Sequence, residues 1–234
     1  MSKRNDYLRG YAKAIPVAIS AAAYGLAIGA TAAGRGVGLG MLIAQDIVLF
    51  AGASQFVIID QWGDSMAIGA VVAAVAALNL RYLLMTAALR PMFATRTVLQ
   101  AAPFLHFVAD ENWAVAIAEF RKRPTTGPWF LLGSGCAMVT FWLAGTVAGH
   151  QLASVVLDPA RYGIDFVFTA VFTALAVSAF RGRSDILPYA VACTVAVVSR
   201  QLLPGSWYIV CGGLCGALAA ALAPDRAAQE QQVG

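Results

Sequence analysis

Long apolar stretches alternate with short polar breaks along the whole chain. Most stretches run for about 20 residues, the length that a helix needs to cross a bilayer. They are continuous and rich in alanine and leucine, whereas the strands of a membrane β-barrel alternate apolar and polar positions. The pattern therefore predicts an all-α fold, a polytopic transmembrane helical bundle. Eight stretches have this character: Ala12–Ala33, Leu39–Ile59, Met66–Leu89, Val98–Ala118, Trp129–Gly149, Ile164–Phe180, Ile186–Leu203 and Trp207–Ala223.

The last three stretches are short, so about eight spans are expected and seven remain an alternative. Cytoplasmic loops carry an excess of Lys and Arg. With the N-terminus inside, the inner segments hold Lys3, Arg4, Arg9, Lys13, Arg121, Lys122, Arg123, Arg181, Arg183 and Arg226, and the outer ones Arg35, Arg90, Arg96, Arg161 and Arg200. The apolar stretches and this excess predict a cytoplasmic N-terminus over residues 1–11, a single transmembrane domain over 12–223 and a polar cytoplasmic tail over 224–234.

The composition agrees with a membrane protein and excludes several soluble classes. Hydrophobic residues make up 60% and charged residues 12% of the 234 positions, and the mean hydropathy is +0.72. Soluble domains carry about 25% charged residues, so too few are present to cover a soluble globule. An ordinary cytosolic enzyme, a disordered chain and a nucleic-acid binder are thereby excluded. The four cysteines lie inside apolar stretches and lack ligand spacing, so we expect no metal and no cofactor.

Four charged residues lie within the predicted spans, where each costs at least about 2.5 kcal/mol and is a candidate for function. They are Asp46, Arg81, Asp110 and Glu111. Arg81 lies too deep to reach water easily, so it should pair with an acid or with a substrate carboxylate. On a straight helix Asp110 shares a face with His106 and diverges from Glu111 by about 100°. An acid in a low dielectric can carry a proton. Alternatively, Arg81 neutralises one acid and the other lies closer to water.

The run Phe50–Phe56 places small and polar residues, among them Ser54 and Gln55, inside the second predicted span. Such a run is either an unwound turn that lines a cavity, as in the broken helices of transporters, or a plain helix with a small-residue packing face. On an ideal helix Asp46 shares a face with Phe50 and nearly opposes Gln55.

The third predicted span carries Asn79 and Arg81. On a straight helix the two side chains point about 200° apart, so they face one cavity only if the helix is distorted.

The order and spacing of these segments resemble the AzlC family of branched-chain amino-acid permeases. The matching runs are Phe50–Phe56, Asn79–Tyr82, Asp110–Glu111 and Gly163–Phe166, followed by the Phe-rich segment Phe168–Phe172. The resemblance covers roughly residues 10–180. Two departures bear on substrate choice or coupling: Tyr82 stands where many members have His, and Asp46 is not expected in the motif.

The resemblance implies a multi-pass transporter subunit of the bacterial plasma (inner) membrane that exports branched-chain or similar amino acids, with proton coupling as an option. It also implies a small AzlD-type membrane protein as partner, and valine, leucine, isoleucine or a similar amino acid as substrate; a homo-oligomer stays open. The expected substrate-binding residues are Ser54, Gln55, Asn79 and Arg81, and the expected coupling or ion-pair residues are Asp46, Asp110 and Glu111. Phe50 and Phe56 would form an apolar pocket for an aliphatic side chain.

Two other classes compete with this interpretation. An intramembrane enzyme of the serine-protease kind would use Ser54 and His106, but Gln55 follows Ser54 where a nucleophile loop would have glycine, so we expect no enzyme. A channel would show rings of like charge or a carbonyl-lined filter. The sequence has neither, although an oligomer would bring several copies of Asp46 together. Whether the spans form internal repeats is left open.

Overall fold

The computed structural model describes most of the chain as helices. The described residues are 2–63, 66–94, 96–155, 173, 177, 180, 182–203 and 207–222. Every regular element among them is helical, as predicted. The contacts divide the chain into two compact units: Met1–Trp62 with Leu78–Phe172, and Gly63–Ala77 with Thr173–Gly234.

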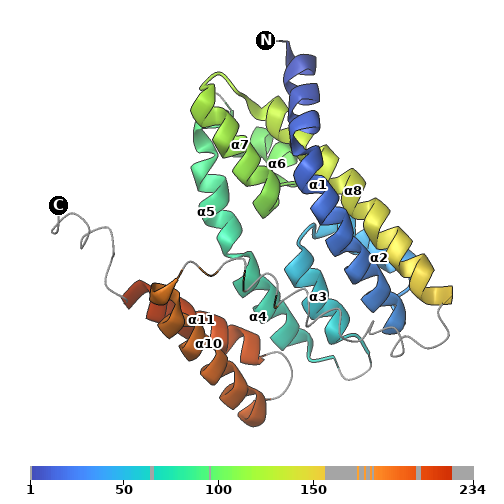
Figure 1. Ribbon diagram of the computed structural model, residues 1–234, viewed down its shortest axis with the longest axis vertical. Coiled ribbons are helices and arrows are strands. Elements are labelled where there is room, and N and C mark those ends of the chain that lie inside the picture. The colour runs from blue at the N-terminus through green and yellow to red at the C-terminus, as the bar shows by residue number, and fades with distance from the viewer. Residues whose placement is uncertain are drawn as a thin grey trace. The chain divides into compact units, whose positions relative to one another are not determined.

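The helices of the first unit include two long ones that lie side by side, α1 and α8 (Figure 1). This unit contains α1 (Lys3–Gly34), α2 (Leu39–Val48), α3 (Gly52–Asp60), α5 (Arg81–Ala88), the 3-10 helix η1 (Arg90–Phe93), α6 (Val98–Leu105), α7 (Asp110–Lys122) and α8 (Pro128–Val155). The second contains most of α4 (Ile68–Asn79), with α10 (Arg183–Leu202) and α11 (Trp207–Leu222). Within the described chain, α1, α4 continued by α5, and α8 are long and apolar enough to cross a membrane.

The helices α1 and α8 run parallel, because the residue numbers of their contacts rise together. Gly10 faces the carbonyl of Phe130, and Gly29 faces the carbonyl of Thr146. A Cβ atom at either glycine would overlap the facing carbonyl oxygen. Glycine is therefore what lets the two backbones approach, as in other small-residue contacts between membrane helices. The parallel direction is the one that the first and fifth predicted spans share.

The second predicted span is broken into α2 and α3. The chain leaves the helix at Leu49 and re-enters it at Gly52, and Phe50 between them has a φ of 42°. A non-glycine residue in the left-handed region is strained and needs surrounding structure to hold it. Of the two alternatives for this run, the structure has the unwound turn.

The fourth predicted span is also broken, between α6 and α7 at residues 106–109. The new helix start is capped by Asn112, whose side chain accepts from the Ala109 N–H at 2.7 Å and donates to the Phe107 carbonyl at 2.9 Å. The prediction of one straight helix here, with His106 and Asp110 on a shared face, is wrong. The third span is interrupted only at Leu80, which keeps helical backbone angles.

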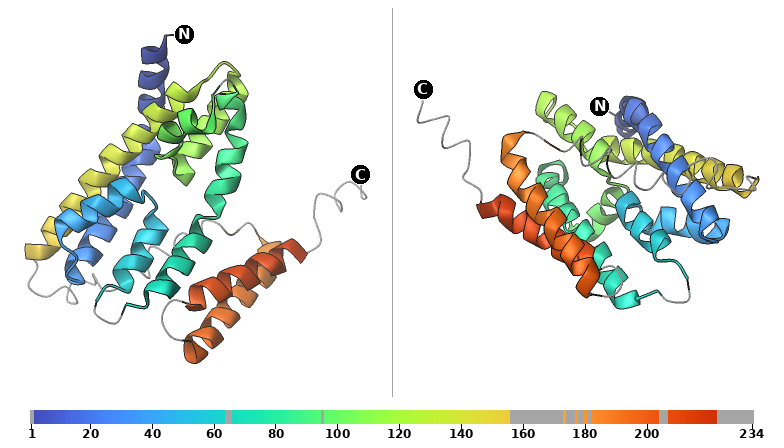
Figure 2. Two further views of the ribbon diagram at one scale, coloured as in Figure 1. Left: turned by 180° about the vertical axis from the view of Figure 1, so that it is seen from behind. Right: turned by 60° about the horizontal axis from the view of Figure 1, so that its bottom comes forward.

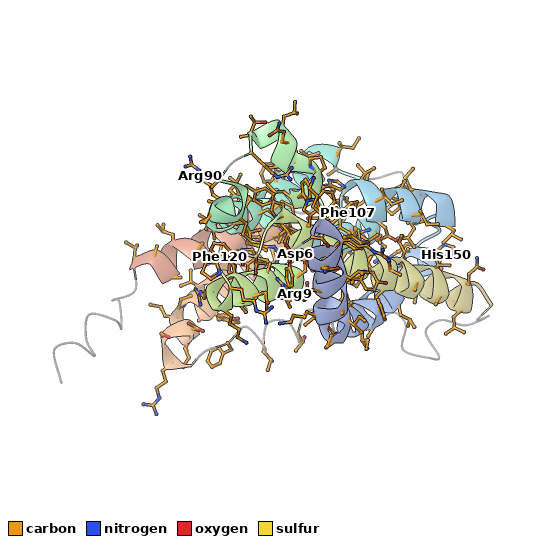
Figure 3. The ribbon with its side chains drawn as sticks, turned by 90° about the horizontal axis from the view of Figure 1, so that it is seen from above. Asp6, Arg9, Arg90, Phe107, Phe120 and His150 are labelled. Carbon is orange, nitrogen blue, oxygen red and sulfur yellow. The ribbon has the colours of Figure 1, made fainter. Side chains whose placement is uncertain are left out.

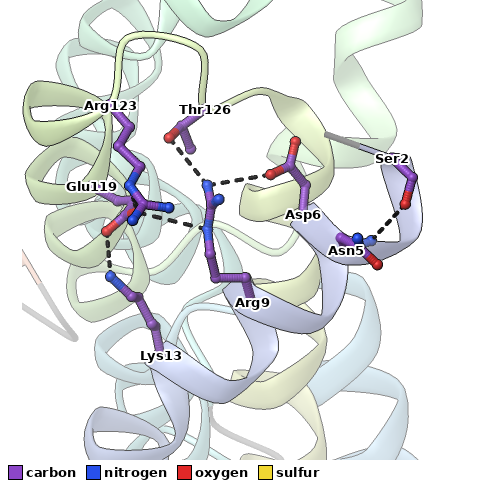
Figure 4. A network of polar contacts seen from close by, with 8 residues as sticks. All are labelled: Ser2, Asn5, Asp6, Arg9, Lys13, Glu119, Arg123 and Thr126. Atoms are coloured by element: carbon purple, nitrogen blue, oxygen red, sulfur yellow. Dashed lines mark hydrogen bonds and ion pairs between the residues drawn. The ribbon is translucent and has the colours of Figure 1, made fainter.

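The buried carboxylate of Glu119 on α7 forms ion pairs with residues of α1. Lys13 Nζ donates to Glu119 at 2.5 Å, and Arg9 and Arg123 lie 3.6 and 3.9 Å from the same carboxyl. Arg9 also pairs with Asp6 at 3.2 Å; Figure 3 shows these two side by side, and Figure 4 shows the three cations converging on Glu119. Glu119 is 4% exposed. It lies just beyond the fourth predicted span, where a charged residue is expected and gives no signal of its role.

In the second unit, α10 and α11 lie side by side (Figure 2). Gly212 and Gly216 of α11 pack against Ala192 of α10. A Cβ atom at either glycine would come within 3.0 Å of an atom of Ala192. The predicted span Ile164–Phe180 lies outside the described residues except for 173, 177 and 180, as does the tail. The number of spans and the orientation of the N-terminus stay predictions.

Candidate functional site

The two helix breaks of the first unit lie against each other. The Phe50 ring of the first break meets the Phe107 ring of the second edge to face, with centroids 5.7 Å apart. His106 Nε2 donates to the Ile47 carbonyl at 2.7 Å. This carbonyl belongs to the last turn of α2, where the helix leaves its acceptors without internal partners. Residues almost 60 positions apart in the sequence thus form one irregular region.

Asp46, in the last full turn of α2, is enclosed by hydrogen-bond donors. Its Oδ1 accepts from Gln55 Nε2 at 2.7 Å and from Trp142 Nε1 at 2.8 Å, and its Oδ2 is 2.7 Å from the Thr146 hydroxyl. Asp46 is 1% exposed and Gln55 is fully buried. The straight-helix expectation that Gln55 nearly opposes Asp46 is wrong, because the break turns α3 relative to α2.

Aromatic rings close this polar cluster off. Trp142 packs against Tyr24 and Phe50, at centroid distances of 5.6 and 6.5 Å, and Tyr24 meets Phe56 at 5.4 Å. A Cβ at Gly52 would come within 2.7 Å of the Trp142 and Tyr24 rings. Phe50 and Phe56 therefore belong to the packed core around Asp46, and their part in a pocket for an aliphatic side chain stays a prediction.

The junction of α4 and α5 reaches the same region through Asn79. The Ser54 hydroxyl donates to Asn79 Oδ1 at 3.0 Å. Ser54 is fully buried and lies in the first turn of α3, next to Gln55. Three of the four predicted substrate-binding residues, Ser54, Gln55 and Asn79, are thus brought together by contacts among α2, α3 and the end of α4.

The fourth, Arg81, pairs with Asp110. Arg81 Nη1 lies 2.8 Å from Asp110 Oδ2, and the two side chains are 42% and 50% exposed. The guanidinium also lies over the Tyr82 ring, 5.3 Å from its centroid. Asp110 is the first residue of α7, where the helix dipole favours a negative charge. Of the two partners considered for Arg81, the structure has the intramolecular acid.

The last predicted site residue, Glu111, takes no part in the contacts described above. Glu111 follows Asp110 on α7 and is exposed. Ser54 and His106, the pair that a serine hydrolase would need, bond to Asn79 and to the Ile47 carbonyl respectively. No group of three or more His, Cys, Asp or Glu residues in the described ranges is placed to hold a metal ion.

Two residues that the sequence did not indicate, Trp142 and Thr146, complete the Asp46 cluster. Both lie on α8, almost 100 positions from Asp46. In the sequence, Trp142 cannot be distinguished from other apolar residues of its span. Thr146 lies inside a run of small residues, which indicates helix packing alone. Asn112 carried a weaker signal, because a polar residue at the third position of a helix can accept from the backbone N–H of the cap residue, as Asn112 does for Ala109.

The region thus combines two kinds of group. Asp46 is buried and, among the described residues, accepts hydrogen bonds from uncharged donors, whereas the Arg81–Asp110 pair offers one charge of each sign at a half-exposed position. Broken helices with such groups near their ends are what transporters use to hold small charged substrates and coupling ions.

Comparison with known proteins identifies the family. The family model for AzlC protein matches residues 16–156. The Inner membrane protein YgaZ of Escherichia coli (strain K12) is 26% identical over 220 residues, which are 92% of this chain and 89% of that protein. No solved structure matches the chain. The matched range contains both helix breaks, the Asp46 cluster and the Arg81–Asp110 pair, and the chain belongs to the AzlC family as a multi-pass inner-membrane protein with a transport-related function.

Proposed function

We propose that this chain is the large subunit of a secondary transporter that exports branched-chain or similar amino acids across the inner membrane. We propose a small AzlD-type membrane protein as its partner. Family membership supports the general activity, and the resemblance described above supports the branched-chain class. The single observation that carries the proposal is the Arg81–Asp110 ion pair beside two broken helices.

An amino acid carries a carboxylate and an ammonium group, and neither charge can be left unpaired in a low dielectric. In the proposed mechanism the substrate carboxylate binds Arg81 and its ammonium group binds Asp110, in place of the bond between the two side chains. Each charge then has a partner of opposite sign before, during and after binding. In the empty carrier the charges of the site are paired with each other at 2.8 Å. The empty site can therefore change the side of the membrane to which it is open without a substrate.

Ser54 and Asn79 give the proposed site its neutral polar groups. Asn79 lies two residues before Arg81, and its Oδ1 accepts from Ser54. In the proposed mechanism the Asn79 amide and the Ser54 hydroxyl turn to hydrogen-bond the substrate's backbone groups, which also distinguishes a zwitterion from a simple ion. No cofactor and no chemical step on the substrate form part of this proposal.

The first experiment tests transport itself. The purified chain, with an AzlD-type partner, is placed in liposomes and the flux of radiolabelled leucine, valine and isoleucine is measured under a pH gradient and under substrate exchange. Cells that express both proteins should also tolerate excess branched-chain amino acids. If no amino acid moves under either condition, the proposed function is wrong.

The second experiment tests the ion pair. R81A and D110N should each lower substrate-dependent exchange by roughly 10- to 100-fold, the effect of losing one charged hydrogen bond of about 1.5–3 kcal/mol. The double variant R81D with D110R keeps an ion pair but reverses it, so it should not recover exchange. The matched control reverses the exposed pair Arg35–Asp60, 2.8 Å apart near the end of α3, and should keep transport.

A structural role of the Arg81–Asp110 pair makes the opposite prediction. In that case the reversed pair restores exchange, because the bond between the two side chains is all that matters. A readout that does not need transport is the rise in thermal unfolding midpoint on adding leucine, since a ligand that binds the folded state stabilises it. The wild type should show the rise and R81A should not.

A further inference from the structure

Asp46 is a buried acid in a predicted span, and none of the ion pairs among the described residues includes it. A carboxylate taken out of water costs several kcal/mol unless a counter-charge, hydrogen bonds or a proton compensate. Acids that face the interior of a membrane protein typically belong to ion or proton pathways. Within the part of the chain that the structure describes, the carboxyl of Asp46 accepts hydrogen bonds from three uncharged groups.

We propose that Asp46 is the site at which the carrier takes up and releases a coupling proton, and that Gln55 passes the resulting change in charge toward the Arg81–Asp110 pair. This inference deepens the transport function proposed above and depends on it.

The cluster suits the ionised form of Asp46. The Trp142 indole is a donor only, and together with Gln55 Nε2 it donates to Oδ1. The Thr146 hydroxyl donates to Oδ2 at 2.7 Å. Hydrogen bonds to a charged acceptor are roughly twice as strong as those between neutral groups, so the three donors stabilise the carboxylate.

The same cluster also offers every donor an acceptor when Asp46 is protonated. The Thr146 hydroxyl oxygen lies 3.2 Å from the Leu143 carbonyl as well as 2.7 Å from Asp46 Oδ2. When Oδ2 carries the proton, it donates to Thr146 Oγ1, and the Thr146 hydrogen turns to the Leu143 carbonyl. Oδ1 still accepts from Trp142 and Gln55. One O–H bond forms on binding and breaks on release, and every donor keeps an acceptor in both states.

A metal ion fits this cluster less well than a proton. A cation site needs several oxygen atoms turned toward one point. Two of the three groups around the Asp46 carboxyl present N–H instead. A proton needs only one free lone pair on Oδ2 and the acceptor that Thr146 supplies.

Among the described residues, the titratable groups around this cluster contact groups other than the Asp46 carboxyl. We therefore assign the change of charge inside the cluster to Asp46. From α1, Tyr24 packs on Trp142. From the end of α6, His106 bonds to the Ile47 carbonyl next to Asp46, and from α8 His150 bonds to the Val37 carbonyl at 2.8 Å. Both histidines contact backbone carbonyls of other residues, and within the described chain the donors to Asp46 itself are neutral.

Gln55 links Asp46 to the proposed substrate site. Its Oε1 is buried and has no hydrogen-bond partner among the described residues, so the bond from Nε2 to Asp46 is what holds the amide. Protonation of Asp46 weakens this bond. Gln55 follows Ser54, which bonds to Asn79, two residues before Arg81. In this proposal a looser start of α3 acts on Asn79 through the Ser54 hydrogen bond, and Asn79 acts on Arg81 through the two residues of backbone between them.

The first test detects the protonation of Asp46 without measuring transport. Trp142 is one of five tryptophans, and its indole N–H senses the charge of Asp46. The full chain in detergent is titrated between pH 5 and 9, and tryptophan emission is recorded. The wild type should show a pH-dependent change that is absent from both D46N and W142F. A change of the same size in D46N would overturn the proposal.

The second test reads coupling in liposomes. D46N should lose leucine accumulation driven by a pH gradient, and its leucine exchange should no longer vary with pH. If D46N fails to fold, T146V and T146S replace it: valine removes the acceptor for the Asp46 proton and should lose coupling, whereas serine keeps the hydroxyl and should keep coupling. Equal coupling in T146V and T146S, or wild-type accumulation driven by sodium instead of protons, would overturn it.

The two proposals fail in different ways. If wild-type liposomes move no amino acid at all, the transport function is wrong, whatever the tryptophan titration gives. If they move amino acids and D46N accumulates them under a pH gradient like the wild type, only the assignment of the proton to Asp46 is wrong.

Discussion

The acid that joins α1 to α7 allows a sharp prediction about stability. E119Q keeps the shape of the side chain and removes its charge, which leaves Lys13, Arg9 and Arg123 around a neutral amide. Removing one partner of a buried ion pair costs about 3–5 kcal/mol. Lys13 and Arg123 are about half exposed and can be rehydrated, so we expect about 2–3 kcal/mol.

The assay is thermal unfolding of the purified chain in one detergent at neutral pH. For a chain of this size 1 kcal/mol shifts the midpoint by about 2–4 °C, so E119Q should unfold about 5–10 °C below the wild type. The matched control is D60N, which removes the carboxylate of the Arg35–Asp60 pair, where Arg35 is about half exposed. An exposed pair contributes at most about 1 kcal/mol, so D60N should shift the midpoint by no more than about 3 °C.

The pH dependence gives a second check on the same residue. The hydrogen bond from Lys13 and the charges of Lys13, Arg9 and Arg123 hold the pKa of Glu119 below its ordinary value, against the effect of burial. The stabilisation is therefore present above the unfolded pKa of about 4.3 and is lost as the pH falls through the lower folded pKa. The gap between wild type and E119Q should shrink in that acidic range. A gap equal to that of D60N, or one that does not shrink with acid, refutes this reasoning.

Two further predictions concern packing and capping, and both are read from the same unfolding midpoint. G29A should lose about 1–3 kcal/mol, because its Cβ would overlap the carbonyl of the parallel helix α8. G213A, on α11 with open space around it, should gain up to about 1 kcal/mol from helix propensity; equal effects would mean that α1 and α8 lie farther apart. N112A should lose about 1 kcal/mol or more through the unpaired Ala109 N–H. N112D keeps the acceptor for Ala109 and should fall between N112A and the wild type; an N112A midpoint equal to the wild type would show that this cap contributes nothing.

Much of the site could be predicted from single residues. Charged side chains inside apolar runs stand out because burial without compensation is costly, so Asp46, Arg81 and Asp110 were visible as candidates. The depth of Arg81 indicates that it needs a partner, either an acid or a substrate carboxylate, and the structure has the acid Asp110. The break near Phe50 was one of two alternatives, because small and polar residues weaken a helix without always ending it.

The predictions that were wrong concern the directions in which side chains point. On straight helices Gln55 opposes Asp46, and His106 shares a face with Asp110. In the structure both relations are changed by breaks at residues 49–51 and 106–109. A break of three or four residues rotates all that follows, so a periodicity argument holds within one helix and fails across the interruption.

The sequence by itself determined the class of the protein, its all-helical membrane architecture and the short list of charged residues that need partners. These are local properties, since an apolar run and a charged residue inside it can both be recognised within one segment, without knowing what that segment packs against. Only the tertiary structure decided the partners. Asp46 meets Trp142 and Thr146 because α2 packs against α8, and it meets Gln55 because the break in the second span turns α3 relative to α2. A hydrogen bond depends on distance and direction between helices far apart in the chain, and neither is written in any one segment.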